Sequence, residues 1–291
     1  SNKNIKQYIM KKIALLGLAF AAFTTAFAQV GFKRKKEDIE KFKDTRLVVV
    51  LSPDSAYNAS IIEAVEKYWT FNGGFLFEYD SAMKPYNKPE YSYLYFSKSK
   101  GTKIKAKLGT CEDDFNGLLI TTGGKFKKKA LKLDLVAGAF CSNFIDTADW
   151  RPELTRAVQM LNNYLNTAIE ADGDKGITTN YIADNAPTNS SLLDQTLLLP
   201  LRSLDLKGKE DAATLWGGEV EDVEVDETYK AIMSRSDKII FYYSKDEKRC
   251  NKIVTSTSGE LVYFAEDAVD KCKLTAKDLK AMNAKRTRAT K

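Results

Sequence analysis

Two hydrophobic patterns follow one another at the start of the first half of the chain. A continuous apolar run at Leu47–Leu51 is typical of a strand covered on both faces. Apolar residues then recur at helical spacing up to Trp69, and Gly73-Gly74 ends that segment. Alternation at Phe75–Tyr79 predicts a second strand. A strand, a helix and a strand in so short a stretch predict a right-handed βαβ unit with parallel strands.

The following residues predict further strands and one long helix. Tyr91–Phe96 and Lys103–Leu108 alternate, and Gly117–Thr122 and Lys132–Val136 flank the hairpin signal Gly123-Gly124. Asp149 is expected to cap a helix that has Pro152 in its first turn. The apolar stripe of this helix is expected to consist of Leu154, Ala157, Val158, Leu161, Leu165 and Ala168.

The second half partly repeats this order. Leu197–Leu201 is again an apolar run, and Trp216 precedes Gly217-Gly218 as Trp69 precedes the first diglycine. A candidate strand at Glu219–Val225 then follows. We therefore expect two similar sheets in which the two apolar runs are equivalent buried strands and both tryptophans pack against the sheets. The alternative is that two ordinary α/β segments match by chance.

The resemblance between the halves continues through later strands. Tyr93–Lys98 resembles Ile240–Lys245, and each is followed by two more candidate strands. The proposed matches pair Lys103–Leu108 with Asn251–Thr255, and Gly117–Thr122 with Glu260–Phe264. Thr275 and Asp278 form a capping box at the start of a last short helix.

The predicted fold class is α/β, with a mixed α+β arrangement as the alternative. Each half is expected to be a mixed sheet with a βαβ start and following antiparallel strands. The expected organisation is a signal peptide (1–28), a basic arm or linker (29–45), a first α/β domain (46–172), a linker (173–190), a second α/β domain (191–285) and a tail (286–291).

The segment from Met10 to Ala28 predicts export. Lys11 and Lys12 precede an apolar run, which ends at the small-x-small motif Ala26-Phe-Ala28. The uninterrupted run is shorter than the roughly 20 residues of a membrane-spanning helix, although an uncleaved anchor is the alternative. Cleavage after Ala28 would give a periplasmic or secreted bacterial protein with no transmembrane segment.

The composition of the chain excludes several classes of function. The chain has 45 Lys and Arg against 39 Asp and Glu, and four of the lysines precede residue 28, where there are no acids. The remainder is close to neutral, which does not predict nucleic-acid binding. There is no histidine, which excludes Ser-His-Asp and Cys-His catalysis. We assign no catalytic residue, no metal site and no cofactor, because phosphate-loop and calcium-loop motifs are incomplete.

Four cysteines in an exported chain permit two disulfides. The local pairing joins Cys111 to Cys141 and Cys250 to Cys272, one bond in each half. Four buried free thiols are the alternative.

Two groups of side chains are candidates for recognition or catalysis. Strand alternation places Tyr91, Tyr93 and Tyr95 on one face, where an open surface would bind a glycan or peptide. If this face is covered, the tyrosines belong to the core instead. The acidic stretch 219–227 is consistent with an exposed edge strand, or with one partner of a catalytic carboxylate pair.

The sequence therefore predicts a non-catalytic binding or scaffold protein of a bacterial cell envelope. Its partners would be an envelope protein or a glycan. The alternative is a carboxylate-dependent, glycosidase-like hydrolase that acts on polysaccharide.

Overall fold

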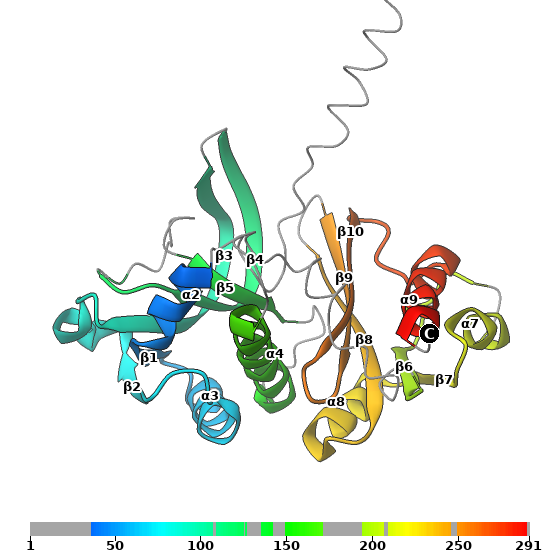
Figure 1. Ribbon diagram of the computed structural model, residues 1–291, viewed down its shortest axis with the longest axis horizontal. Coiled ribbons are helices and arrows are strands. Elements are labelled where there is room, and N and C mark those ends of the chain that lie inside the picture. The colour runs from blue at the N-terminus through cyan, green and yellow to red at the C-terminus, as the bar shows by residue number, and fades with distance from the viewer. Residues whose placement is uncertain are drawn as a thin grey trace, which may run out of the picture.

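The computed structural model describes residues 36–106, 109–124, 126, 135–141, 149–170, 194–206, 209–245 and 249–289. In this part of the chain, two five-stranded mixed sheets are accompanied by helices (Figure 1). The predicted signal peptide 1–28 and linker 173–190 lie outside the described residues. Among the helices that are described, none is both long enough and apolar enough to cross a membrane.

The first half contains the predicted βαβ unit. Its strands follow the order β2-β1-β3-β4-β5; β1 is parallel to both neighbours, and β3, β4 and β5 are antiparallel. The elements are α2 (Lys36–Lys43), β1 (Arg46–Leu51), α3 (Ser55–Tyr68), β2 (Phe75–Tyr79), the 3-10 turns η1 (Asp80–Ala82) and η2 (Lys84–Tyr86), β3 (Tyr91–Ala106), β4 (Gly109–Thr121), β5 (Leu135–Phe140) and α4 (Arg151–Glu170).

The second half has the same sheet topology. Its order is β10-β9-β8-β6-β7; β6 is parallel to both neighbours, and β8, β9 and β10 are antiparallel. The elements are β6 (Thr196–Pro200), α7 (Lys209–Trp216), β7 (Val220–Val223), α8 (Val225–Ser234), β8 (Lys238–Lys245), β9 (Arg249–Ser256), β10 (Leu261–Ala268) and α9 (Ala276–Ala289).

The hydrogen-bond registers of the two central strands confirm that the halves are similar. The N–H group of Leu47 donates to Gly74, and that of Leu197 donates to Glu219. Leu47 lies opposite Ser92, and Leu197 lies opposite Ile239. The segments beginning at Tyr93 and Ile240 therefore occupy the same register, as their sequences predict.

The later strand matches were wrong by one strand. Ser97 pairs with Gly117, whereas Ser244 pairs with Asn251. The strand β9 therefore corresponds to the part of β4 that begins at Gly117, and β10 corresponds to β5. The difference arises because β3 has 16 residues and β8 only eight, so the first half carries a longer β3–β4 ribbon. Alternating residues indicate a strand but not where the chain turns back.

Both predicted tryptophans are buried at the ends of equivalent helices. Trp69 is the C-cap of α3 and belongs to the core of the first half. Its Nε1 donates to Asn72 at 3.1 Å, and Asn72 in turn donates to the carbonyl of Phe42 in α2. Part of the predicted basic arm is therefore a helix anchored to the first half. Trp216 ends α7 and is buried in the core of the second half.

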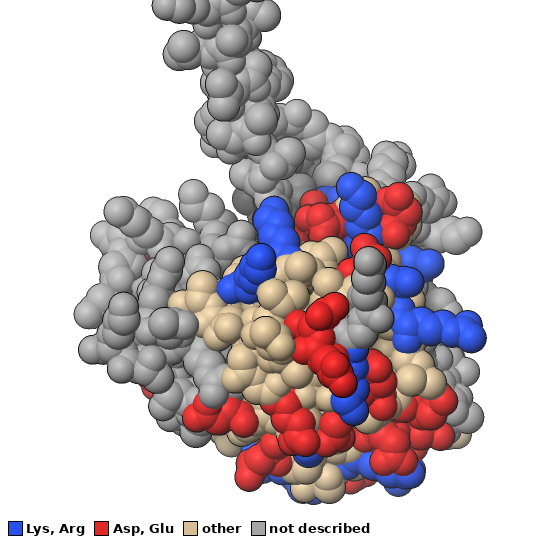
Figure 2. All heavy atoms as spheres, turned by 90° about the vertical axis from the view of Figure 1, so that its right-hand side faces the viewer, with Lys and Arg blue, Asp and Glu red and all other residues tan. Residues whose placement is uncertain are grey.

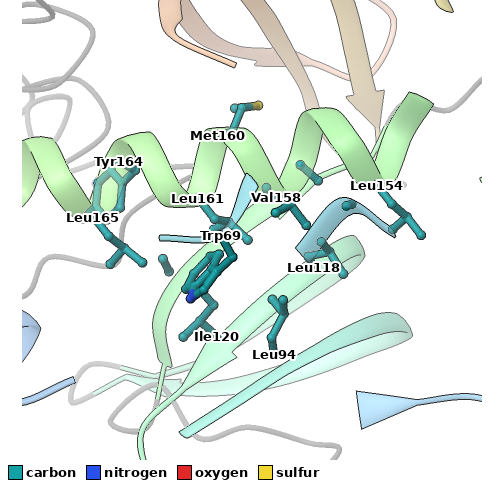
Figure 3. Close-up of a cluster of buried hydrophobic side chains, with 14 of the residues drawn as sticks. Trp69, Leu94, Leu118, Ile120, Leu154, Val158, Met160, Leu161, Tyr164 and Leu165 are labelled. Atoms are coloured by element: carbon teal, nitrogen blue, oxygen red, sulfur yellow. The ribbon is translucent and has the colours of Figure 1, made fainter. Parts of the chain in front are cut away.

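The helix α4 lies between the two sheets, and 14 of its 20 residues are buried. Figure 3 shows Leu161 and Leu165 pointing toward Trp69 and the first sheet, whereas Met160 points to the opposite side. The same hydrophobic cluster includes the second-sheet residues Tyr242, Ile253, Leu261 and Phe264. The two halves therefore share one continuous core around α4.

The cysteines form one of the two predicted disulfides. Cys250 is bonded to Cys272, with a Cα–Cα distance of 5.4 Å. Cys141 is a free, buried thiol, so the predicted Cys111–Cys141 disulfide is not formed. The strand register explains this: Phe140 pairs with Gly117, so Cys141 comes level with Asn116, five residues from Cys111 along β4. That separation is roughly 17 Å, far beyond the reach of a disulfide.

Candidate functional site

A pocket of about 380 Å³ lies at the amino ends of β6 and β8 in the second half. It is lined by Gln195, Arg235, Asp237, Ser256, Thr257 and Ser258. These residues come from three separate segments that the sheet brings together. All six side chains are polar or charged, so the pocket is suited to a ligand that forms hydrogen bonds.

Arg235 is placed by the end of α8. Its φ of 50° puts it in the left-handed region, and its N–H group caps the helix by donating to Ala231 and Ile232. This conformation is uncommon for a residue with a Cβ atom. It turns the chain toward β8, so that both Arg235 and Asp237 lie exposed at the pocket. The Arg235 guanidinium also lies 5.6 Å from the ring centre of Tyr68 in the first half.

The hydroxyl groups of the pocket belong to the turn between β9 and β10. The Oγ atoms of Ser256 and Ser258 are 2.9 Å apart, and the Thr257 hydroxyl donates to the carbonyl of Ser236. The Nδ2 of Asn163, in α4, donates to the Ser258 carbonyl at 3.0 Å. The turn is therefore held by hydrogen bonds to α4 on one side and to the segment before β8 on the other.

Gly259 allows this turn to approach α4. Its φ is 83°, and a Cβ atom placed there would lie 2.6 Å from the Cβ of Gln159. A larger residue would therefore be strained in conformation and would also collide with the helix. The close approach seats the hydroxyl-bearing turn against the shared core.

Two glutamine side chains near this turn have buried amide atoms without a hydrogen-bond partner among the described residues. These atoms are the Oε1 of Gln195 and both the Oε1 and the Nε2 of Gln159. Buried polar atoms are hydrogen-bonded in the large majority of native proteins. Gln195 lines the pocket, but its Oε1 atom is itself buried from solvent, so the exposed Arg235 and Asp237 are the groups that a ligand can reach directly.

The predicted tyrosine face is largely covered. Tyr93 and Tyr95 are buried, and only Tyr91 is partly exposed. The Tyr93 hydroxyl lies within hydrogen-bond distance of the carbonyls of Tyr86 and Gly124, which share its single proton, and burial raises its pKa to about 12. The ring of Phe126 packs on both buried tyrosines. The three tyrosines thus contribute to the core in this structure, and binding by them stays a prediction.

The acidic stretch 219–227 is divided between two elements. Glu221 and Asp222 lie on β7, which is the edge strand of the second sheet, in agreement with the edge-strand interpretation. Asp226 and Glu227 lie in the first turn of α8, where the helix dipole favours negative charge. Within the described residues, no group of three or more Cys, Asp and Glu could hold a metal ion.

The pocket residues lie in short polar loops, which are ordinary connections, so the sequence alone does not mark them as a site. One signal was present in the repeat itself. Arg235-Ser-Asp237 precedes β8 as Lys88-Pro-Glu90 precedes β3, and Lys88 and Glu90 form an ion pair at 3.7 Å. In the first half, the backbone of Gly123 approaches the carbonyl of Tyr91 so closely that a Cβ atom there would lie 2.1 Å from it. Where the second half has its pocket, the first half therefore has an ion pair and a close backbone contact.

Comparison with known proteins adds no assignment: no family model, curated protein or solved structure matches the chain.

Proposed function

We propose that the protein is an exported, non-catalytic binding protein of a bacterial cell envelope, and that its pocket binds a sugar unit of an envelope glycan. The observation that carries this proposal is the wholly polar lining of the pocket, at which the charged side chains of Arg235 and Asp237 are exposed. Its volume is at the lower end of the usual range for small-molecule sites.

The lining chemistry supports a glycan. Sugar hydroxyl groups both donate and accept hydrogen bonds. Arg235 supplies donors, Asp237 and Gln195 supply acceptors, and the hydroxyls of the β9–β10 turn supply both. The guanidinium and carboxylate also permit bidentate contacts to neighbouring hydroxyls, which fix the orientation of a ligand.

The same lining favours binding over hydrolysis. A glycosidase of the common type needs two carboxyl groups roughly 5–10 Å apart across the scissile bond. Asp237 is the only carboxylate among the six lining residues. The alternative of a carboxylate-dependent hydrolase therefore lacks its second acid at this pocket.

Two further features support an exported location. The segment from Met10 to Ala28 has the pattern of a cleavable signal peptide. The Cys250–Cys272 disulfide is compatible with an oxidising compartment.

The test is titration calorimetry with N-acetylglucosamine and its β-1,4-linked dimer. Arg235→Gly keeps the left-handed backbone and removes the guanidinium, so we expect at least tenfold weaker binding than in the wild type. Arg202→Gly is the matched control, because Arg202 also has a positive φ, of 66°, and does not line the pocket.

The proposal fails if the wild type binds neither sugar, or if the two glycine variants bind equally well. A reducing-end assay on the dimer separates binding from hydrolysis. Release of monosaccharide by the wild type, abolished in Asp237→Asn, would favour the hydrolase instead.

A further inference from the structure

The strand β2 has an unpaired edge. It is the last strand of the first sheet, and no other described strand pairs with its outer side. The N–H group of Leu47 donates to the carbonyl of Gly74, and Leu47 lies opposite Phe75. In a parallel ladder, the backbone hydrogen bonds of a residue go to the two neighbours of the residue opposite it, which here are Gly74 and Leu76. The N–H and C=O groups of Phe75 and Phe77 therefore point to the open side, away from β1, whereas the N–H of Tyr79 donates to the Glu78 carboxylate at 2.8 Å. Figure 1 shows β2 on the outer side of this half, away from the second sheet.

The equivalent edge in the second half carries more charge than β2. Strand β7 carries Glu221 and Asp222 in a stretch of four residues, and such charges hinder edge-to-edge pairing. Figure 2 shows many acidic side chains on the face of the second half where β7 lies. The sequence of β2 is Phe-Leu-Phe-Glu-Tyr, with Glu78 as its one charged residue. The position of Phe77 in β2 corresponds to that of Asp222 in β7.

The side chains of β2 match a second copy of the same strand. In an antiparallel pair centred on Phe77, Phe75 lies opposite Tyr79 of the partner subunit, and Leu76 lies opposite Glu78 of the partner subunit. All cross-strand pairs on one face are then aromatic, and no two charges of the same sign face each other. Phe75 and Phe77 already contact each other edge-to-face within one chain, with ring centres 5.6 Å apart. Tyr79 is half exposed, at 50%.

We infer that the protein forms a two-fold symmetric dimer through antiparallel pairing of β2 with β2 of a second copy, which joins two first sheets into one continuous sheet. The two-fold match argues for a second copy as the occupant, because an isologous interface must be complementary to itself. Centring on Phe77 also uses the whole strand, with the N–H of Tyr79 exchanging its hydrogen bond to Glu78 for one to a carbonyl of the second copy. Five-residue strands bury little area, so association is expected to be weak and concentration-dependent.

Cysteine cross-linking tests the register. In the proposed pair, Phe77 lies opposite its own copy at a Cα–Cα distance of about 5.5 Å, within disulfide reach. Phe77→Cys should therefore form a covalent dimer on mild oxidation. Tyr79→Cys is the matched control, because residue 79 is offset by four positions from its own copy, about 13 Å along the strand. The wild type reports any background from the native cysteines.

Sedimentation equilibrium tests the dimer without new cysteines. The weight-average mass of the wild type should rise between low micromolar and near-millimolar concentration. Tyr79→Asp should abolish that rise, and circular dichroism should show that the half-exposed position tolerates the change. Asp222→Asn, on the other edge strand, should leave the rise unchanged. A wild type that is monomeric throughout, or cross-linking at position 79 as fast as at position 77, would overturn the inference.

Discussion

Replacing Arg156 by Met tests how the shared core accommodates a buried charge. The side chains of Arg156 and Glu153 are 1% and 2% exposed, and they form an ion pair on one side of α4. The guanidinium lies 3.5 Å from the ring centre of Tyr242 in the second sheet. Met keeps much of the apolar stem and removes the guanidinium, so Glu153 is left buried without its cation.

The expected loss of stability follows from these contacts. Removing one partner of a buried ion pair costs about 3–5 kcal/mol, mostly because the other charge stays buried and uncompensated. The desolvated cation–π contact adds up to about 2 kcal/mol, although the two effects overlap. Burial acts to lower the pKa of Arg156, but Glu153 outweighs it and the net pKa is raised, so the group is charged when folded. We expect a loss of about 4 kcal/mol for Arg156→Met.

The double variant Glu153→Met with Arg156→Met separates pairing from packing. Replacing both partners by apolar residues removes the uncompensated charge, so it should be much less destabilised than the single variant. Urea unfolding followed by circular dichroism measures the free energies, and a double-mutant cycle gives the coupling. The exposed pair Glu227–Lys230 in α8 has the same spacing, and Lys230→Met should change stability little.

Two outcomes would refute this reasoning. One is that Arg156→Met destabilises the protein no more than Lys230→Met, which would mean that solvent reaches Glu153. Alternatively, the double variant could be as unstable as the single one, which would assign the effect to lost packing rather than to the unpaired charge.

The remaining predictions concern the two buried tryptophans and stability at acid pH. Trp69→Ala and Trp216→Ala should each cost about 3–5 kcal/mol in urea unfolding, because both rings are buried in equivalent cores; a silent Trp216→Ala would contradict this. Burial acts to raise the pKa of Asp278, but hydrogen bonds from Tyr263 and Lys252 outweigh it and lower the pKa below 3.8. The unfolded state therefore binds more protons, and this contribution to stability is present above pH 3.8 and lost as pH falls through the lowered pKa. In Asp278→Asn, the free energy of unfolding should therefore fall less steeply as the pH is lowered, which urea unfolding at a series of pH values measures.

The regular elements were predictable because their hydrophobic periods are strong. The runs at Leu47–Leu51 and Leu197–Leu201 gave the central strands, although Leu201 itself lies beyond β6 and is 49% exposed. The stripe from Leu154 to Ala168 gave the side of α4 that faces the first sheet. These patterns depend on local burial, which sequence spacing reports directly.

The remaining side of α4 was not predictable in the same way. Glu153, Arg156 and Gln159 are polar and interrupt the stripe, so the spacing indicates a solvent-facing side. They are buried because the second half packs on them: Tyr229 contacts Glu153, Tyr242 contacts Arg156, and the turn at Gly259 lies against Gln159. The pocket was missed for the same physical reason: its three polar segments are far apart in the chain and meet only through sheet pairing.

The helices α4 and α9 follow equivalent sheets and pack on equivalent helices, yet their outer sides differ. Met160 and Arg156 of α4 contact the second sheet, whereas Lys277 and Lys280 of α9 are exposed. In stacked repeat proteins, an internal unit buries both of its sides, and the terminal unit has a polar outer face that keeps the stack soluble. By this criterion, α4 is a joint between modules and α9 is an end cap. A third module could be added to the described stack only if the lysine-bearing side of α9 were redesigned as an apolar joint.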